Sequence, residues 1–251
     1  MKPIWVILLL LLLGGNLLGG YILYKAIRLR AENQLLQKYL ENLTSKNREL
    51  TTDYAGMSVY ATENRLLLET TTPTERNQMC VLFGASITKG FNADSLLPEF
   101  KIVNRGVGGQ SSTQLLARFS SDVLQLEPGW VVVKICAGNF NPSVNSQVIW
   151  DEFETMLLTA RTRNIEPVVA TIVPVTRRAE EYDGYSISDQ VRQFNAKARE
   201  FARQHGFRLV DYFEAIADRE GFLPDDLARD AIHPNALGYE KMAEAYRVAM
   251  K

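Results

Sequence analysis

The sequence predicts an α/β domain built on a doubly wound, parallel, five-stranded sheet. From Met79 onward, short apolar runs rich in β-branched residues alternate with segments of helical pattern. Nearly continuous apolar runs are typical of strands buried on both faces of a sheet, and the longer segments between them suit crossover helices. Strands are predicted at 80–83, 101–104, 130–135, 167–172 and 208–210, and helices at 111–126, 146–163 and 188–205. In such a sheet the binding site lies at the carboxyl ends of the strands.

The composition is that of an ordinary globular protein and narrows the possible partners. Of 251 residues, 46% are hydrophobic and 23% are charged, so a sizeable core is expected. With 28 basic and 29 acidic residues the net charge is −1, and no basic field would attract nucleic acid. Cys80 and Cys136 both lie in apolar runs, where we expect reduced cysteines of the core.

Residues 1–25 are predicted to form a membrane anchor. No charge separates Lys2 from Lys25, and a helix over residues 4–24 would be roughly 30 Å long, about the thickness of the hydrocarbon core. A cleaved signal peptide is the alternative, but the small-residue cleavage pattern is missing. Basic residues after the span favour a cytoplasmic location for the rest of the chain, whereas a short N-terminal signal anchor often holds a domain outside the cytoplasm. We expect a single-pass protein with its catalytic domain outside the cytoplasm.

Residues 26–55 are predicted to form a juxtamembrane helix with a short heptad pattern. Leucines recur every seven residues at positions 29, 36, 43 and 50, and Asn33, Leu40, Asn47 and Tyr54 follow the complementary spacing. This pattern predicts a parallel homodimer through residues 29–54, with a monomeric helix as the alternative. Residues 56–77 are then predicted to be a linker, and residues 78–251 the catalytic domain.

Four predicted loops at strand ends carry residues suited to catalysis. They contain, in order, Gly84-Ala85-Ser86, a glycine-rich run ending at Gly109, Ala137-Gly138-Asn139, and Asp230-Ala231-Ile232-His233-Pro234. A nucleotide-binding loop is disfavoured, because the glycine run lacks both the lysine-serine ending of a P-loop and the full dinucleotide spacing.

Together these four motifs resemble the blocks of the SGNH hydrolases, also called the GDSL esterase and lipase family. The resemblance covers residues 79–250 and implies a flavodoxin-like, three-layer fold. It also implies that the backbone N–H groups of Ser86 and Gly109 and the side-chain amide of Asn139 form an oxyanion hole. The sequence departs from the family pattern at Ala85, Ala137 and Phe140, where aspartate, glycine and aspartate are usual.

The chemistry of the residues leads to the same site. A serine hydroxyl needs a base within hydrogen-bond reach, and the base needs its other nitrogen held in place. His233 is the histidine that lies in a loop with a nearby acid, Asp230, whereas His205 precedes a glycine at a predicted helix end. We therefore predict a catalytic triad of Ser86, His233 and Asp230, with no metal or cofactor.

The expected activity is hydrolysis of an ester with a short acyl group such as acetyl. Arg177, Tyr182 and Tyr185 lie in the loop after the fourth strand, where we expect a substrate rim suited to a sugar-bearing ester. Two alternatives stay open: an acyltransferase acting on an envelope glycan, and a catalytically inactive binding module with the same fold.

Overall fold

The structure is a computed structural model that describes residues 2–141, 143–180 and 186–251; at positions 2, 3, 5–18, 49 and 50 only the backbone is described. The chain divides into two compact units, Met1–Asp53 and Tyr54–Lys251.

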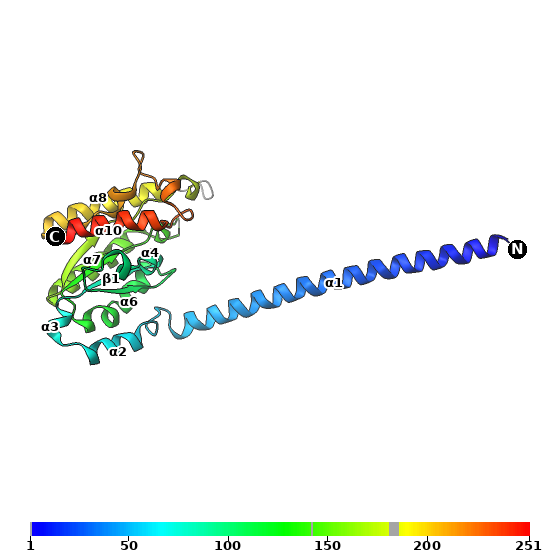
Figure 1. Cartoon of the computed structure of the whole chain (residues 1–251), viewed down its shortest axis with the longest axis horizontal. Helices are drawn as coiled ribbons and strands as arrows, with labels where there is room; N and C mark the ends of the chain where they lie inside the picture. Colours follow the sequence, from blue (N-terminus) through cyan, green and yellow to red (C-terminus); the bar gives the residue numbers. More distant parts are fainter. Residues whose placement is uncertain (1, 142, 181–185) are drawn as a thin grey trace. The chain divides into compact units, whose positions relative to one another are not determined.

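The first unit is a single helix, α1 (Lys2–Thr52), which joins the predicted anchor and the predicted juxtamembrane helix (Figure 1). Among the described residues, no helix is both long and apolar enough to cross a membrane. The predicted span over residues 4–24 falls mostly on positions 5–18, whose side chains lie outside the description, and it stays a prediction. Tyr54 does not continue the predicted heptads, because the helix ends at Thr52 and Tyr54 belongs to the second unit.

The second unit contains the predicted five-stranded parallel sheet. Its strands are β1 (Cys80–Gly84), β2 (Ile102–Gly106), β3 (Trp130–Lys134), β4 (Glu166–Ala170) and β5 (Arg208–Val210). They pair in the order β2-β1-β3-β4-β5, and the predicted strand ends are correct to within two residues. Gly84 is in register with both Gly106 and Lys134, so the three strands end side by side. This common edge carries three of the four predicted catalytic loops, those of Ser86, Gly109 and Asn139.

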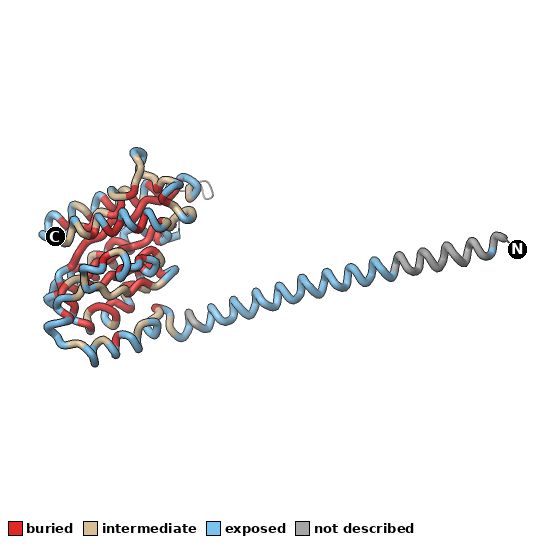
Figure 2. The backbone as a smooth tube through the Cα atoms, in the orientation of Figure 1, coloured by how far each residue is buried: buried red, intermediate tan, exposed pale blue. Residues whose placement is uncertain are grey.

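Helices cover both faces of the sheet and complete three layers. One face packs against α6 (Ser112–Asp122), α7 (Ser146–Thr162) and α8 (Ile187–His205); the other packs against α4 (Ser86–Gly90), α9 (Tyr212–Ile216) and α10 (Ala236–Met250). Successive strand residues alternate between the two cores, as Phe83 and Leu82 do. Figure 2 shows the buried residues concentrated in this unit. Cys80 and Cys136 are free and buried, which confirms the prediction.

The segment predicted as a linker belongs to the second unit. It forms α2 (Ala61–Thr70) and α3 (Pro73–Arg76), and the side chains of Asn64 and Arg76 are buried. The Asn64 amide donates hydrogen bonds to the Ser121 carbonyl at 3.1 Å and to the Asp122 carboxylate at 2.8 Å. The catalytic unit therefore begins at Tyr54 and not at position 78, because these polar contacts dock the segment onto α6.

Short helical turns complete the unit: α5 (Ala93–Leu96), η1 (Leu124–Leu126), η2 (Ala137–Asn139), η3 (Arg177–Ala179) and η4 (Asp225–Leu227).

Candidate active site

Ser86 is placed at the sheet edge by a tight turn after β1. A Cβ atom on Gly84 would lie 2.8 Å from the Lys134 carbonyl oxygen, so only glycine fits where β1 meets β3. The chain then turns at Ala85 and enters α4 with Ser86 as its first residue. The first N–H groups of a helix have no partner within the helix, which leaves the Ser86 N–H group suited to binding an oxyanion.

Asp230 and His233 lie in one loop that is stabilised by its own hydrogen bonds. The Asp230 Oδ1 atom accepts from the backbone N–H groups of Ile232 at 3.1 Å and His233 at 2.9 Å. A bridge between Ala228 and Pro234 closes the loop at its base. The carboxylate is therefore fixed by the same turn that presents the imidazole.

The imidazole of His233 connects Asp230 to Ser86. Its Nδ1 atom is 2.9 Å from Asp230 Oδ1, and its Nε2 atom is 2.8 Å from Ser86 Oγ. An ionised carboxylate only accepts hydrogen bonds, so Nδ1 donates to Asp230 and Nε2 is left to accept from the serine hydroxyl. The structure thus brings together all three residues of the predicted triad.

Asp230 remains ionised under ordinary conditions. Partial burial raises the pKa of its carboxyl group, but hydrogen bonds from the Ile232 N–H group and from the ring and N–H group of His233 outweigh this effect. The net result is a pKa of about 2. The carboxylate can therefore stabilise a positively charged imidazole throughout the neutral range.

The predicted oxyanion donors lie in the neighbouring loops. Gly109 has a φ of 77°, a left-handed conformation that favours glycine after β2. Asn139 is buried; its Oδ1 atom accepts from the Ser112 N–H group at 2.6 Å, and its Nδ2 atom donates to the Cys136 carbonyl at 3.1 Å. Because an amide NH₂ group carries two protons, one remains available for a ligand.

One cavity of about 530 Å³ connects these groups. Ser86, Gly109, Asn139 and His233 all line it, and its volume suits a small ligand. Its wall also includes Tyr54, Val144, Val148, Thr113 and Glu152.

The predicted substrate rim is described only at Arg177. Its guanidinium forms ion pairs with Asp218 at 2.9 Å and Glu220 at 2.7 Å, and Arg177 is not among the described residues that line the cavity. Tyr182 and Tyr185 lie outside the described residues. Their predicted role stays a prediction.

Comparison with known proteins assigns the chain to a family. A sequence model of the GDSL-like lipase/acylhydrolase family matches residues 82–241. The chain belongs to this family. It is accordingly a carboxylic ester hydrolase of the GDSL type.

Individual relatives of this GDSL-type esterase are distant. An acetylxylan esterase from Geobacillus stearothermophilus is 24% identical over 155 residues, which cover 58% of this chain and 70% of the relative. The crystal structure of a GDSL-like lipase from Bacteroides thetaiotaomicron has a TM-score of 0.70 at 23% identity, covering 79% of this chain and 98% of the lipase. A variant of an acetyl-xylooligosaccharide esterase from Geobacillus has a TM-score of 0.55 at 18% identity, covering 69% of this chain and 94% of the relative. The two structural likenesses show the fold alone.

The three departures from the family pattern are buried, apolar positions of the esterase. Ala85, Ala137 and Phe140 are at most 3% exposed. The Phe140 ring packs edge-on against Phe194 with a centroid distance of 5.7 Å. A phenylalanine in place of the usual aspartate thus joins the loop of Asn139 to the core beneath α8.

Two residues contribute to the site that the sequence did not predict there. Thr176 is buried, and its N–H and hydroxyl groups both donate to the Ala231 carbonyl at 3.0 Å, which holds the loop of His233. Tyr54 lines the cavity, although the heptad pattern placed it in the predicted coiled coil. The sequence offered no signal for Tyr54, whereas Thr176 begins the loop that was expected to overhang the site.

The remaining histidine lies at a helix end before a glycine, as predicted. His205 is the last residue of α8, its Nδ1 atom lies 3.0 Å from the Phe201 carbonyl oxygen, and Gly206 follows in a left-handed conformation. Among the residues that the structure describes, no three His, Cys, Asp or Glu side chains are grouped as a metal site requires.

Proposed function

We propose that this esterase releases short acyl groups from ester substrates by nucleophilic attack of Ser86. The observation that carries the proposal is the continuous hydrogen-bonded chain from Asp230 through His233 to the Ser86 hydroxyl. A hydroxyl in contact with a correctly oriented imidazole can lose its proton as it attacks, and such an arrangement defines a serine hydrolase by geometry and roles.

The reaction proceeds in two steps, acylation of Ser86 and hydrolysis of the acyl-serine. Ser86 Oγ bonds to the ester carbonyl carbon while its proton passes to His233 Nε2. The tetrahedral intermediate expels the alcohol, which takes that proton, and an acyl-serine remains. Water then attacks the acyl-serine, again giving its proton to His233, and Ser86 regains the proton as the carboxylic acid leaves. In both steps the oxyanion binds the N–H groups of Ser86 and Gly109 and the free amide proton of Asn139.

We assign the acyl group as acetyl and the alcohol as a sugar hydroxyl. Support comes from the acetylxylan esterase relative and from an acetyl-xylooligosaccharide esterase among the structural neighbours. The cavity wall supports the same assignment, because it places apolar Val144 and Val148 near hydrogen-bonding groups such as Thr113.

A chain-length series tests this function. Purified full-length protein is given p-nitrophenyl acetate, butyrate, octanoate and palmitate, and acetate release is measured from an acetylated xylo-oligosaccharide. We expect kcat/KM to be highest for acetate and free acetate to appear from the sugar ester. Preference for palmitate would contradict the acyl assignment, and acetate that reappears on an added glycan acceptor would favour transfer over hydrolysis.

The N-terminal helix is assigned a tethering role in this proposal. Residues 4–24 would anchor the esterase in a membrane, with the catalytic unit outside the cytoplasm, and the heptad leucines would pair two copies. Leu29, Leu36 and Leu43 are 59%, 54% and 46% exposed in the single chain, which leaves this apolar stripe available for a partner. Membrane association that resists carbonate extraction tests the anchor. Protease accessibility in intact cells tests the location of the catalytic unit, and sedimentation of the detergent-solubilised protein tests the pairing of two copies.

A further inference from the structure

Arg118 is a fully buried arginine that the proposed reaction does not use. It lies on α6, its exposed fraction is 0%, and its guanidinium stacks 4.3 Å from the centre of the Phe83 ring. A charge in such surroundings is costly unless it is paired and hydrogen-bonded. Asp122 pairs with it at 2.7 Å, and both side chains are inaccessible to solvent.

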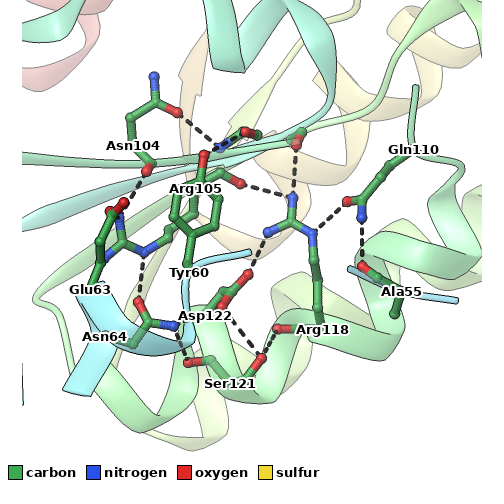
Figure 3. Close-up of polar contacts among 12 residues, drawn as sticks. Ala55, Tyr60, Glu63, Asn64, Asn104, Arg105, Gln110, Arg118, Ser121 and Asp122 are labelled. Carbon is green, nitrogen blue, oxygen red and sulfur yellow. Dashed lines mark hydrogen bonds and ion pairs between the residues drawn. The ribbon is translucent and has the colours of Figure 1, made fainter. Parts of the chain in front are cut away.

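The remaining donors of Arg118 bind the ends of β1 and β2. Its Nη2 atom donates to the carbonyl oxygens of Gly84 at 2.9 Å and of Arg105 at 2.8 Å (Figure 3). Gly84 is two residues before Ser86. One nitrogen therefore joins the two neighbouring strands at the point where the loop of Ser86 and the loop of Gly109 leave the sheet.

Another donor of Arg118 reaches the glycine loop directly. The Nε atom donates to the Gln110 side-chain oxygen, and the Gln110 amide donates in turn to the Ala55 carbonyl. Gln110 follows Gly109 and lines the same cavity as Ser86. Figure 3 shows the side chain of Arg118 between the strand ends on one side and Gln110 on the other.

The segment from Ala55 to Asn64 is hydrogen-bonded to the same network. Asn64 donates to Asp122 at 2.8 Å and accepts from Arg105 Nε at 2.7 Å. The Tyr60 hydroxyl donates to the Gly106 carbonyl at 2.6 Å. This segment lies before residues 82–241, which the family model matches, so part of the support of the site comes from outside that region.

We infer that Arg118 is a positioning residue that fixes Ser86 and the Gly109 N–H group relative to each other, through the Gly84 carbonyl and the Gln110 side chain. The inference rests on the proposed function, because it concerns the alignment of nucleophile and oxyanion donor. A planar guanidinium can bind carbonyls and side chains in several directions at once, whereas an ammonium cannot reproduce this fork. A displacement of about 1 Å between reacting groups can cost about 10²-fold in rate.

Arg118→Lys in the full-length protein tests the role, with Arg76→Lys as a matched control. Arg76 is also buried and also binds a backbone carbonyl, that of Thr71, and an acidic side chain, that of Glu127. It lies in α3, before β1, and its carbonyl accepts from Met79 and Gly129 at the amino ends of β1 and β3, away from the catalytic loops. Both substitutions remove a buried guanidinium, but only that of Arg118 binds the strand ends next to the site.

The measurements are kcat and KM for p-nitrophenyl acetate, the rate of Ser86 labelling by a fluorophosphonate, and Tm. For Arg118→Lys we expect kcat and the labelling rate to fall about 10-fold to 100-fold with KM within threefold. For Arg76→Lys we expect a lower Tm with kcat within twofold. Arg118→Lys that is folded and retains native kcat and labelling would overturn the inference, because a merely structural role lowers Tm alone.

Gln110→Met decides the question if Arg118→Lys does not fold. This variant keeps the buried ion pair of Arg118 and Asp122. It removes the link from Arg118 to the glycine loop, together with the hydrogen bond from Gln110 to the Ala55 carbonyl. We expect kcat to fall about 10-fold. Native kcat in folded Gln110→Met would then overturn the inference. Absence of turnover and labelling in the native protein would instead contradict the proposed function, which separates the two failures.

Discussion

The Nε2 atom of His233 lies 2.8 Å from the Oγ atom of Ser86, although 147 residues separate the two along the chain. Ser86 follows β1, and His233 lies in the loop before α10, so the contact depends on the whole sheet being assembled. If this contact performs the proposed hydrolysis, we expect activity to require an assembled sheet.

Replacement of either contact partner removes the nucleophilic step. For Ser86→Ala and for His233→Ala we expect kcat/KM with p-nitrophenyl acetate to fall about 10³-fold or more, and the double variant to be scarcely worse than either single one, because the two act as a unit. Circular dichroism at equal concentration checks that the variants fold. Equal rates in native protein and His233→Ala would contradict the triad.

Replacement of Asp230 tests the orientation of the imidazole. In Asp230→Asn the amide can donate to Nδ1, which favours the tautomer that carries its proton on Nε2 and cannot accept from Ser86. Because the Asp230 side chain is 45% exposed, we expect a moderate loss in kcat, about 10-fold to 10³-fold. An unchanged kcat would show that the ring is held by other groups.

The same carboxylate has a predictable effect on stability against pH. Its pKa in the folded protein is about 2, below the ordinary value of 3.8, so its contribution is present above about pH 4 and is lost as the pH falls through 2. The difference in free energy of unfolding between native protein and Asp230→Asn should therefore shrink between pH 4 and pH 2. Urea unfolding at a series of pH values measures it, and a constant difference would contradict the assignment.

Two variants of Asn139 separate its donor from its acceptor. Asn139→Asp keeps an oxygen for the Ser112 N–H group but has no amide proton for an oxyanion, whereas Asn139→Ala loses both. We expect both to lower kcat about 10²-fold to 10³-fold with little change in KM. Asn195 is a suitable control, since its buried amide binds the backbone of Ile172. Asn195→Ala should lower Tm more than kcat, and a kcat loss equal to that of Asn139→Ala would contradict the oxyanion role.

The strands could be predicted because their apolar pattern is visible in short stretches of sequence. A run such as that of β3 is apolar at nearly every position, since both faces of a doubly wound sheet are covered. Asp230 and His233 could be predicted for a similar reason. Both belong to one short loop, and hydrogen bonds within this loop join them.

The supports of the site could not be predicted, because they depend on contacts between distant segments. Arg118 looks like a charged residue of an amphipathic helix, and its burial follows only when β1 and β2 end beside α6. The segment from 56 to 77 has little apolar periodicity, and Asn64 docks it through an amide. A polar residue that becomes buried cannot be distinguished from an exposed one by composition or period.

Lys134 provides a last prediction, on stability. It ends β3, is 4% exposed, and lies among apolar side chains that include Leu82, Phe91 and Met242. Burial lowers the pKa of its ammonium group to about 8, against a smaller opposing effect of Cys136. Because the folded protein binds this proton less readily than the unfolded chain, the charge of Lys134 destabilises the fold fully below about pH 8. This cost diminishes as the pH rises from 8 to 10.5.

Lys134→Met should therefore stabilise the protein at neutral pH. We expect the free energy of unfolding at pH 7 to rise by about 3 kcal/mol, since methionine fills a similar space without a charge to desolvate. The gain should diminish as the pH rises from 8 to 10.5, where the native lysine becomes neutral in the unfolded chain as well. Urea unfolding of both proteins across this range gives the difference directly. A gain that does not change with pH would mean that the lysine reaches solvent in the folded protein and that packing alone accounts for the effect.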